Sequence, residues 1–285
     1  MIEIWGSIKN ATTSEPLSMS WEECRDYCFE TNSCLAVRQT DTGCEAYRFG
    51  HLSSVGIEGS MTGERIAIKK NLTICPDTLQ NMIANIQSIE LFSSETLDYS
   101  YSMNTEIVDG QTIWTIDVGH FFECPDKSFI SERGDTKVCI TARLFPDSFP
   151  CDIQASGAEL CAQEPQGMSL TGPYSYEEGN KVMTGLDKNC AVHFSNCNYW
   201  IDGTRFNQTD FQVTDTTLNG TNGYQWNRIR AEVTSAHQCV FLAARNEDNF
   251  GKVFIHDCTI YTDKLDGYCQ RGAMCRVNPE YEYTN

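Results

Sequence analysis

The chain has 285 residues, 40% of them apolar, and a formal net charge of −18. This length suggests about two domains, and this apolar content supports packed cores and argues against global disorder. The acidic balance argues against nucleic acid or an anionic membrane surface as a partner, because both attract proteins with surplus positive charge. No stretch of the sequence approaches the roughly 20 consecutive apolar residues of a membrane span.

Cysteine and sequon patterns indicate an extracellular protein. The chain has 15 cysteines, a load that is rare in the reducing cytosol. No CxxC pair and no paired histidines supply zinc-ligand spacing, so we expect disulfide bonds. The start at Met1-Ile2-Glu3 does not read as a signal peptide, so we expect that the signal was removed or that the start is misplaced. Four N-x-T sequons also indicate secretion: Asn10, Asn71, Asn207 and Asn219.

A first module is predicted at residues 1–70. Ser20 and Glu23 form a capping-box pattern, in which each side chain satisfies an unpaired backbone donor of the other residue. Trp21, Cys24 and Cys28 then fall on one face of the helix that begins there. A helix with two cysteines one turn apart can be stapled twice to the same neighbour.

That neighbour is predicted to be a short strand pair, Leu35–Gln39 and Glu45–Arg48, joined through Thr42-Gly43. A nested pairing of the four cysteines connects the helix to these strands most economically. Each bond would contribute about 2–4 kcal/mol to a small core. The predicted bonds are Cys24–Cys44 and Cys28–Cys34.

The run from Ser20 to Gly50, with its cysteine spacing and with Tyr47 and Phe49, resembles the CW or PAN-like (apple-related) module of secreted nematode proteins. The preceding Ile4-Trp5-Gly6 is similar to the usual opening of that module. The resemblance implies an adhesive, non-catalytic domain. It defines no binding residue.

A connector is predicted at residues 71–123. Ile83–Leu91 is interpreted as a short helix, and two stretches of alternating apolar residues flank Asp109-Gly110, which is a strong hairpin signal. Because an isolated hairpin is marginal in water, we expect it to pack on the second module. Cys75 has no obvious local partner. Since 15 is an odd number, Cys75 is our candidate for an unpaired cysteine, which would allow a disulfide-linked dimer.

A second module is predicted at residues 124–278, followed by a tail at 279–285. A cysteine-bounded stretch with a strand at Val138–Ala142 comes first. A helix near 153–161 and a second helix beginning at Ser175, with a capping box to Glu178, come next. The strand Tyr199-Trp200-Ile201 then runs into Asp202-Gly203 and is predicted to be buried.

This order resembles a C-type lectin-like domain of the long form, with Trp200-Ile201-Asp202-Gly203 in place of the family's Trp-Ile-Gly core strand. The fold class is therefore predicted to be α+β, with two disulfide-rich modules. Cys269 competes with Cys275 for Cys161, and a Cys190–Cys197 loop and a Cys151–Cys269 bond are open alternatives for the surplus cysteines. The bonds that the resemblance implies are Cys124–Cys139, Cys161–Cys275 and Cys239–Cys258.

The calcium site of sugar-binding relatives is not expected here. In those relatives, a Glu-Pro-Asn or Gln-Pro-Asp triplet in the long loop and a Trp-Asn-Asp strand supply oxygen ligands to Ca²⁺. The loop from Thr204 to Gln238 contains no proline, and in Phe254–Cys258 only Asp257 is a plausible oxygen ligand. We therefore expect no cofactor, although calcium binding without the usual motif stays open.

Four further loop residues are candidates for ligand contact together with Asp257: Asp210, Asp215, Tyr224 and Trp226. The aromatic pair could stack on a sugar or a peptide, or it could fill a secondary core. The sequons at Asn207 and Asn219 fall in the same loop, where glycans would crowd a binding face.

No catalytic constellation is recognised. None of the five histidines lies in an H-E-x-x-H motif or beside a G-x-S-x-G motif, and no phosphate-binding loop occurs. The sequence therefore predicts a secreted, non-enzymatic protein that binds an extracellular protein or glycan, and the resemblance implies a role in innate defence or surface interactions. Two alternatives remain: a true lectin with a rearranged sugar site, and a structural or adhesive matrix protein.

Overall fold

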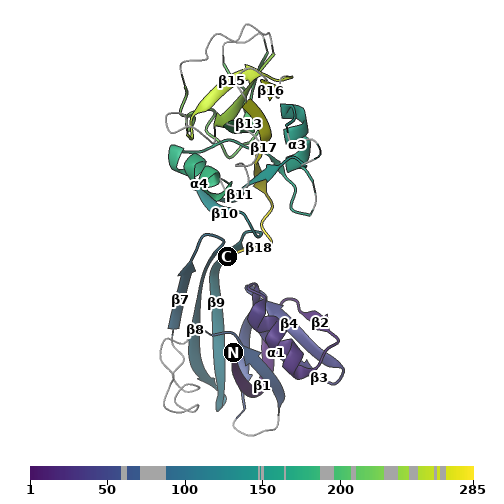
Figure 1. Cartoon of the computed structure of the whole chain (residues 1–285). Helices are drawn as coiled ribbons and strands as arrows, with labels where there is room; N and C mark the ends of the chain where they lie inside the picture. Colours follow the sequence, from purple (N-terminus) through teal and green to yellow (C-terminus); the bar gives the residue numbers. More distant parts are fainter. Residues whose placement is uncertain are drawn as a thin grey trace. The chain divides into compact units, whose positions relative to one another are not determined.

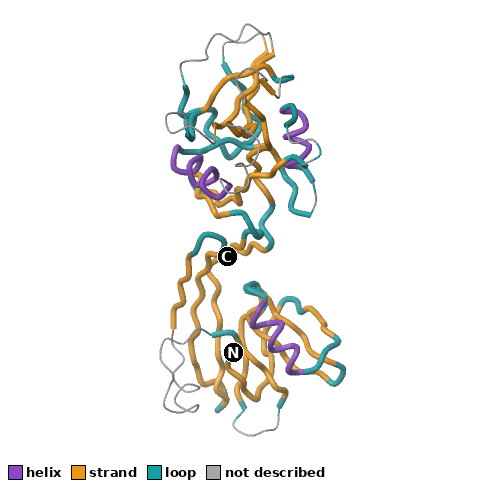
Figure 2. Tube along the Cα trace, in the orientation of Figure 1, coloured by secondary structure: helices purple, strands orange, loops and turns teal. Residues whose placement is uncertain are grey.

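The computed structural model describes residues 1–58, 63–70, 88–146, 148, 151–163, 165–186, 196–206, 210–227, 237–243, 250–259, 262–263 and 268–285. The chain divides into two compact units, Met1–Glu123 with Tyr281–Asn285, and Cys124–Glu280 (Figures 1 and 2). The predicted disulfide-rich character is confirmed, but strands predominate, and the described part has only three helices. None of these helices is long and apolar enough to cross a membrane.

The first unit is built on one ten-stranded sheet with a single described helix on it (Figure 1). The strand order is β2-β4-β3-β6-β1-β5-β9-β8-β7, and β18 pairs with β9. The elements are β1 (Ile2–Ala11), β2 (Glu15–Leu17), α1 (Trp21–Glu30), β3 (Cys34–Thr40), β4 (Gly43–Arg48), β5 (Leu52–Ile57), β6 (Glu64–Ile68), β7 (Ser88–Ser93), β8 (Leu97–Val108), β9 (Gln111–Glu123) and β18 (Tyr281–Thr284).

Helix α1 begins with the predicted capping box, which is confirmed. Ser20 Oγ accepts from the backbone N–H of Glu23, and the Glu23 carboxylate accepts from the backbone N–H of Ser20 at 2.8 Å. Trp21, Cys24 and Cys28 are all buried on the side of the helix that faces the strands. Two disulfides attach this helix to β4 and to the start of β3: Cys24–Cys44 and Cys28–Cys34.

The expectation that the connector hairpin packs on the second module is wrong. Its turn lies at Asp109-Gly110, where both residues have positive φ as a two-residue hairpin turn requires. Strand β9 then pairs with β5 of the first module, with Ser54–Ile57 opposite Thr112–Thr115. The physical reason is burial: Trp114 is completely enclosed in the core that the strands of residues 1–70 form.

Two further predictions, the helix at Ile83–Leu91 and the C-terminal tail, differ from the structure. The predicted helix at Ile83–Leu91 is wrong from Ser88 onward, because Ser88–Ser93 forms strand β7 and pairs with β8. Residues 83–87 lie outside the described residues, as does Cys75. The predicted tail forms strand β18, in which Tyr281–Thr284 pairs with His120–Glu123 of β9.

An aromatic cluster fills one end of the first unit's core. Phe49 stacks on Phe121 with 4.7 Å between ring centroids, and its ring is 5.4 Å from those of Tyr99 and Tyr101. Phe49 follows β4, whereas the other three residues lie on β8 and β9. The PAN-like stretch and the hairpin therefore share one hydrophobic core.

The second unit is an eight-stranded sheet with two described helices (Figure 1). The strand order is β10-β11-β17-β13-β14-β15, with β12 and β16 paired to β17, and only the β13–β17 pair is parallel among those described. The elements are β10 (Phe129–Arg133), β11 (Thr136–Leu144), α3 (Gln154–Cys161), β12 (Ser169–Leu170), α4 (Tyr176–Leu186), β13 (Asn196–Phe206), β14 (His237–Ala243), β15 (Val253–Asp257), β16 (Thr262–Asp263) and β17 (Tyr268–Val277).

Strand β13 is the centre of this unit. Tyr199, Trp200 and Ile201 are completely buried, and the Trp200 indole donates to the carbonyl oxygen of Asp152 at 2.7 Å. Helix α3 packs closely on this strand at Gly157. A Cβ atom at that position would lie only 3.3 Å from Trp200, so the absence of a side chain permits the close approach.

Among the described residues, four disulfides constrain the second unit, and three of them are the bonds that the resemblance implied. Cys161 pairs with Cys275, so that Cys269 is left to pair with Cys151 as in the open alternative. Cys190 lies outside the described residues. The four bonds are Cys124–Cys139, Cys151–Cys269, Cys161–Cys275 and Cys239–Cys258.

We expect Trp114→Ala to lower the free energy of unfolding of the first unit by about 3–5 kcal/mol, because it empties a core position that the PAN-like strands enclose. Amide hydrogen exchange in β6 should accelerate with it. Ile107→Ala is the matched control on the same hairpin: Ile107 is 76% exposed, and the change should stay below about 0.5 kcal/mol. Unchanged β6 exchange in Trp114→Ala would contradict a shared core.

Candidate recognition site

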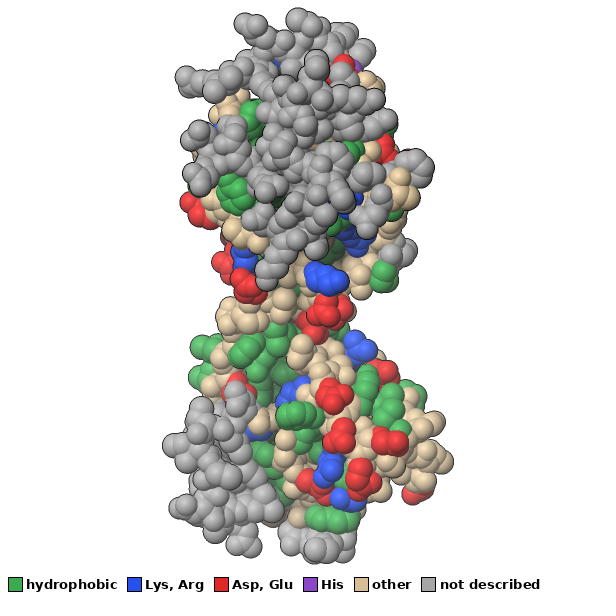
Figure 3. All heavy atoms as spheres, in the orientation of Figure 1, with side chains coloured by type: hydrophobic (Ala, Val, Ile, Leu, Met, Phe, Trp, Pro, Cys, Tyr) green, Lys and Arg blue, Asp and Glu red, His purple; other side chains and the backbone are tan. Residues whose placement is uncertain are grey.

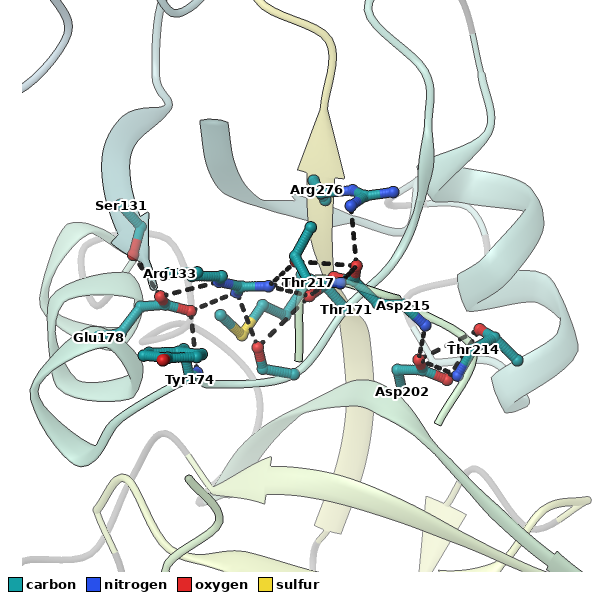
Figure 4. A network of polar contacts seen from close by, with 12 residues as sticks. Ser131, Arg133, Thr171, Tyr174, Glu178, Asp202, Thr214, Asp215, Thr217 and Arg276 are labelled. Atoms are coloured by element: carbon teal, nitrogen blue, oxygen red, sulfur yellow. Dashed lines mark hydrogen bonds and ion pairs between the residues drawn. The ribbon is translucent and has the colours of Figure 1, made fainter. Parts of the chain in front are cut away.

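A buried charge network lies beside the loop that follows β13 (Figure 4). Its centre is Arg133, at the end of β10, whose side chain is completely buried. The guanidinium pairs with Glu178 and lies 3.0 Å from Asp215, and it donates to the hydroxyls of Thr171 and Thr217 at 2.9 Å. Such partners are required, because a buried charge without them costs several kcal/mol.

Glu178 enters the network from the first turn of α4. Ser175 Oγ accepts from the backbone N–H of Glu178 at 3.1 Å, so the predicted N-cap is present. The Glu178 carboxylate, however, accepts from Arg133, Ser131 and the backbone N–H of Tyr174. The capping box is therefore half formed, because a buried guanidinium is a stronger partner for the carboxylate than a backbone donor.

Asp215 joins the network to a second cation. Its buried carboxylate lies 2.9 Å from the guanidinium of Arg276 on β17, and it accepts from the backbone N–H and the hydroxyl of Thr217. Burial acts to raise the pKa of Asp215, but hydrogen bonds from Thr171 and Thr217 and the charge of Arg276 outweigh it, so the pKa is lowered. Asp215 is therefore held as a carboxylate.

Asp202, from the core-strand motif, holds the backbone of the loop through hydrogen bonds. Its carboxylate accepts from the backbone N–H groups of Thr214 and Asp215, both at 2.6 Å. Burial, together with the nearby charge of Asp215, raises the pKa of Asp202 despite these hydrogen bonds. The Tyr224 hydroxyl donates to the Asp202 carbonyl oxygen, which ties the far end of the loop to the same strand.

A surface pocket of about 260 Å³ lies over this loop. The indole of Trp226 is 38% exposed, and its ring lies 5.4 Å from the ring of Phe211. The pocket thus combines an aromatic surface with a carboxylate and a hydroxyl. Its lining residues are Asp210, Phe211, Thr221, Trp226 and Ile255.

Backbone hydrogen bonds hold the two sides of the pocket. Thr204 and Gln212 exchange N–H···O bonds at 2.9 and 2.8 Å, which positions Phe211. On the other side, Val253 donates to the carbonyl of Gln225 and accepts from the N–H of Asn227, and Trp226 lies between these two residues. The Trp226 ring is therefore presented from a loop that is attached to β15.

The structure separates the five predicted ligand-contact residues. Asp210 and Trp226 line the pocket, whereas Asp215 belongs to the buried network. Tyr224 is buried, with its ring 5.6 Å from that of Trp226, so it fills the secondary core. Asp257 is not among the pocket residues, and its carboxylate accepts from the N–H and hydroxyl of Thr259.

Sequence reasoning missed Phe211, Thr221 and Ile255 in the pocket and the central role of Arg133 in the network. Phe211 follows Asp210 directly, so its aromatic character was a usable signal. The sequence around Arg133 contained no such signal, because an arginine in a polar hairpin ordinarily lies in solvent. Its burial depends on partners from distant segments.

Within the described ranges, no group of three or more His, Cys, Asp or Glu side chains is arranged to hold a metal ion. Asp215, a calcium-ligand candidate by residue type, is already neutralised by two guanidinium groups. Asp215 is therefore not an open oxygen ligand for Ca²⁺, which ordinarily takes 6–8 oxygens.

A Ser–His–Asp series lies on β8 and β9, outside the second unit. The ring nitrogens of His120 lie 2.9 Å from Ser100 Oγ and 3.0 Å from Asp98. Ser100 and His120 are opposite each other in the strand ladder, next to an irregularity at Gly119. The series thus joins β8 to β9 across the irregularity by two side-chain contacts of one imidazole.

Comparison with known families identifies the first module. Residues 1–70 match the PAN-like domain, so the predicted PAN-like module is confirmed over that range. A comparison with curated proteins gives no significant match.

We expect Asp215→Asn to destabilise the second unit by about 3–5 kcal/mol near neutral pH, because it leaves buried Arg133 short of one counter-charge. The folded pKa of Asp215 is below its ordinary value of 3.8. The stabilisation is thus present above that value and is lost as the pH falls through the folded pKa.

Chemical denaturation of the wild type and the variant between neutral and acidic pH measures this effect. The gap between the two should narrow in acid. Asp210→Asn, an exposed change in the same loop, should alter stability by less than about 0.5 kcal/mol at any pH. An equal effect of both substitutions would contradict the role of the network.

Proposed function

We propose that this chain is a secreted, non-enzymatic recognition protein in which a PAN-like module precedes a C-type lectin-like domain. The second domain binds an extracellular glycan or protein ligand through the pocket at Trp226, without calcium. The proposal rests on three features of the second unit: its cysteine framework, its pocket and its buried charge network.

The cysteine framework supports the lectin-like assignment. A bridged hairpin (Cys124–Cys139) opens the unit, a helix ends in a cysteine that is bonded to the last long strand (Cys161–Cys275), and a third bond joins β14 to the end of β15 (Cys239–Cys258). This order, with two helices before a buried Trp-Ile strand, is what the resemblance implies for the long form of the family.

The observation that carries the binding proposal is the half-exposed Trp226 beside Asp210. An indole offers a flat apolar surface, which suits the C–H face of a sugar or an apolar side chain. The Asp210 carboxylate and the Thr221 hydroxyl can take hydrogen bonds from ligand hydroxyl or amide groups. A few polar groups on an apolar concave surface are typical of small ligand sites.

Calcium independence is supported by the charged groups that surround Asp215 and Asp202 in the loop after β13. Two guanidinium groups, from Arg133 and Arg276, supply the positive charge around Asp215. Asp202 meanwhile holds two backbone donors of the loop. Asp202 and Asp215 thus have internal partners, so their place in the structure does not require a divalent cation.

Secretion and glycosylation belong to the proposal. Six disulfides among the described residues favour an oxidising compartment. Asn10 and Asn219 are exposed, as glycosylation requires, whereas Asn71 and Asn207 lie outside the described residues. A glycan on Asn219 would stand two residues from Thr221 in the pocket, so binding assays should include Asn219→Gln.

The PAN-like match favours a second candidate function, adhesion through the first unit. Deleting residues 1–70 would not test it cleanly, because β5 and β6 share a core with Trp114. Point variants on exposed surfaces discriminate better.

We expect the full secreted chain to bind members of a glycan array or a panel of extracellular proteins equally well in Ca²⁺ and in EDTA. Trp226→Ala should weaken that binding at least about tenfold, because it removes the aromatic surface. Phe29→Ala is the matched control: Phe29 is an exposed aromatic residue on α1 of the first unit, and its loss should leave binding unchanged.

The alternatives predict other results. Binding that EDTA abolishes would support a true lectin with a rearranged site. Binding that Phe29→Ala weakens and Trp226→Ala does not would support adhesion through the first unit.

A further inference from the structure

Strand β7 is the last strand of the first unit's sheet among the described strands. It pairs with β8 in an uninterrupted register, Ser88–Ser93 opposite Asp98–Met103. In the described part of the chain, no strand pairs with its other edge. An edge strand of this kind presents a row of backbone N–H and C=O groups that can pair with a further strand.

The side chains of β7 are unusual for an edge strand. Ile89 and Leu91 are each 77% exposed on one face, and Phe92 on the opposite face is 41% exposed and stacks on Tyr99. Its charged residue, Glu90, is paired with Lys70 at 2.5 Å. Figure 3 shows hydrophobic side chains gathered at the side of the first unit where β7 and β8 lie.

Edge strands ordinarily carry a device that prevents pairing with other chains, such as a lysine, a proline, a bulge or an inward charge. Strand β7 has no proline, no lysine and no bulge, and its one carboxylate is ion-paired with Lys70 of the same unit. An unprotected edge with apolar residues on both faces is suited to strand addition.

We propose that β7 pairs antiparallel with β7 of a second copy of this chain, so that the two ten-stranded sheets join into one. A two-fold axis through the strand pair places residues of the same face opposite each other. Two copies of β7 can pair in this arrangement, because the exposed aliphatic residues Ile89 and Leu91 of both copies then lie on the same face of the joined sheet.

Charge selects the register. An axis at Glu90 would place two carboxylates directly opposite each other, which is destabilising. An axis at Leu91 places Leu91 opposite its copy, Glu90 opposite Phe92, and Ile89 opposite Ser93. The second register is the one we propose.

A second copy is also favoured by the cysteine count. The 15 cysteines of this sequence are an odd number, so at least one cannot pair with another of them, and a second copy can supply a partner thiol. The strand pairing itself needs no such bond. Its consequence is bivalency, since each dimer carries two of every binding unit and gains avidity on a surface that offers several ligands.

The test is sedimentation equilibrium of the full oxidised chain after free thiols have been alkylated, over concentrations from about 1 to 100 μM. The wild type should dimerise reversibly. Leu91→Lys should raise the dimer dissociation constant at least about tenfold, because it places two ammonium groups opposite each other at the axis. Ile107→Lys, at an equally exposed aliphatic residue of the β8–β9 hairpin, should leave it unchanged.

Hydrogen exchange supplies the second measurement. Backbone amides of β7 should exchange more slowly at high than at low protein concentration, and this difference should disappear in Leu91→Lys. A wild type that stays monomeric, a dimer that is insensitive to Leu91→Lys, or β7 exchange that is independent of concentration would each overturn the proposal. Circular dichroism of the variants checks that the fold is retained.

Discussion

The buried guanidinium of Arg133 is the contact on which the charge network of the second unit depends. It binds partners from helix α4, from the residues that follow β12 and from the turn at 215–217 (Figure 4). Arg276 on β17 completes the charge balance of Asp215. The pocket at Trp226 rests on a loop whose position is set by these contacts and by Asp202.

A buried ionic network is a costly way to stabilise a fold, because both kinds of charge lose their hydration. Apolar side chains of similar volume often stabilise a core equally well. The network can, however, specify one arrangement of the loop, since displacement of any segment would leave a buried charge unpaired. The disulfides act differently: they limit the unfolded ensemble and hold the strands around the network.

Local sequence signals predicted local structure well. The capping box at Ser20, the turn at Asp109-Gly110 and the buried strand at Tyr199–Ile201 each depend on residues that are close in sequence. The strand β7 was missed because Ile89 and Leu91 alternate over only a few residues, too short a pattern to separate a strand from a helix.

Long-range partners could not be derived in the same way. A half-apolar hairpin fits any complementary core, so nothing local indicated that Trp114 packs with strands of residues 1–70. The same limit applied to the candidate site. Asp215 is an ordinary acid in a polar loop by sequence, and only Arg133 and Arg276, which lie far from it in the chain, make it a structural residue.

We propose that internal charges, and not a bound cation, hold the loop that contains Thr214 and Asp215. Hydrogen exchange of the Thr214 and Asp215 amides, which donate to the Asp202 carboxylate, tests this claim most directly when measured in EDTA and in saturating Ca²⁺. The account predicts slow exchange that is the same in both conditions. Fast exchange in EDTA that Ca²⁺ slows would contradict it.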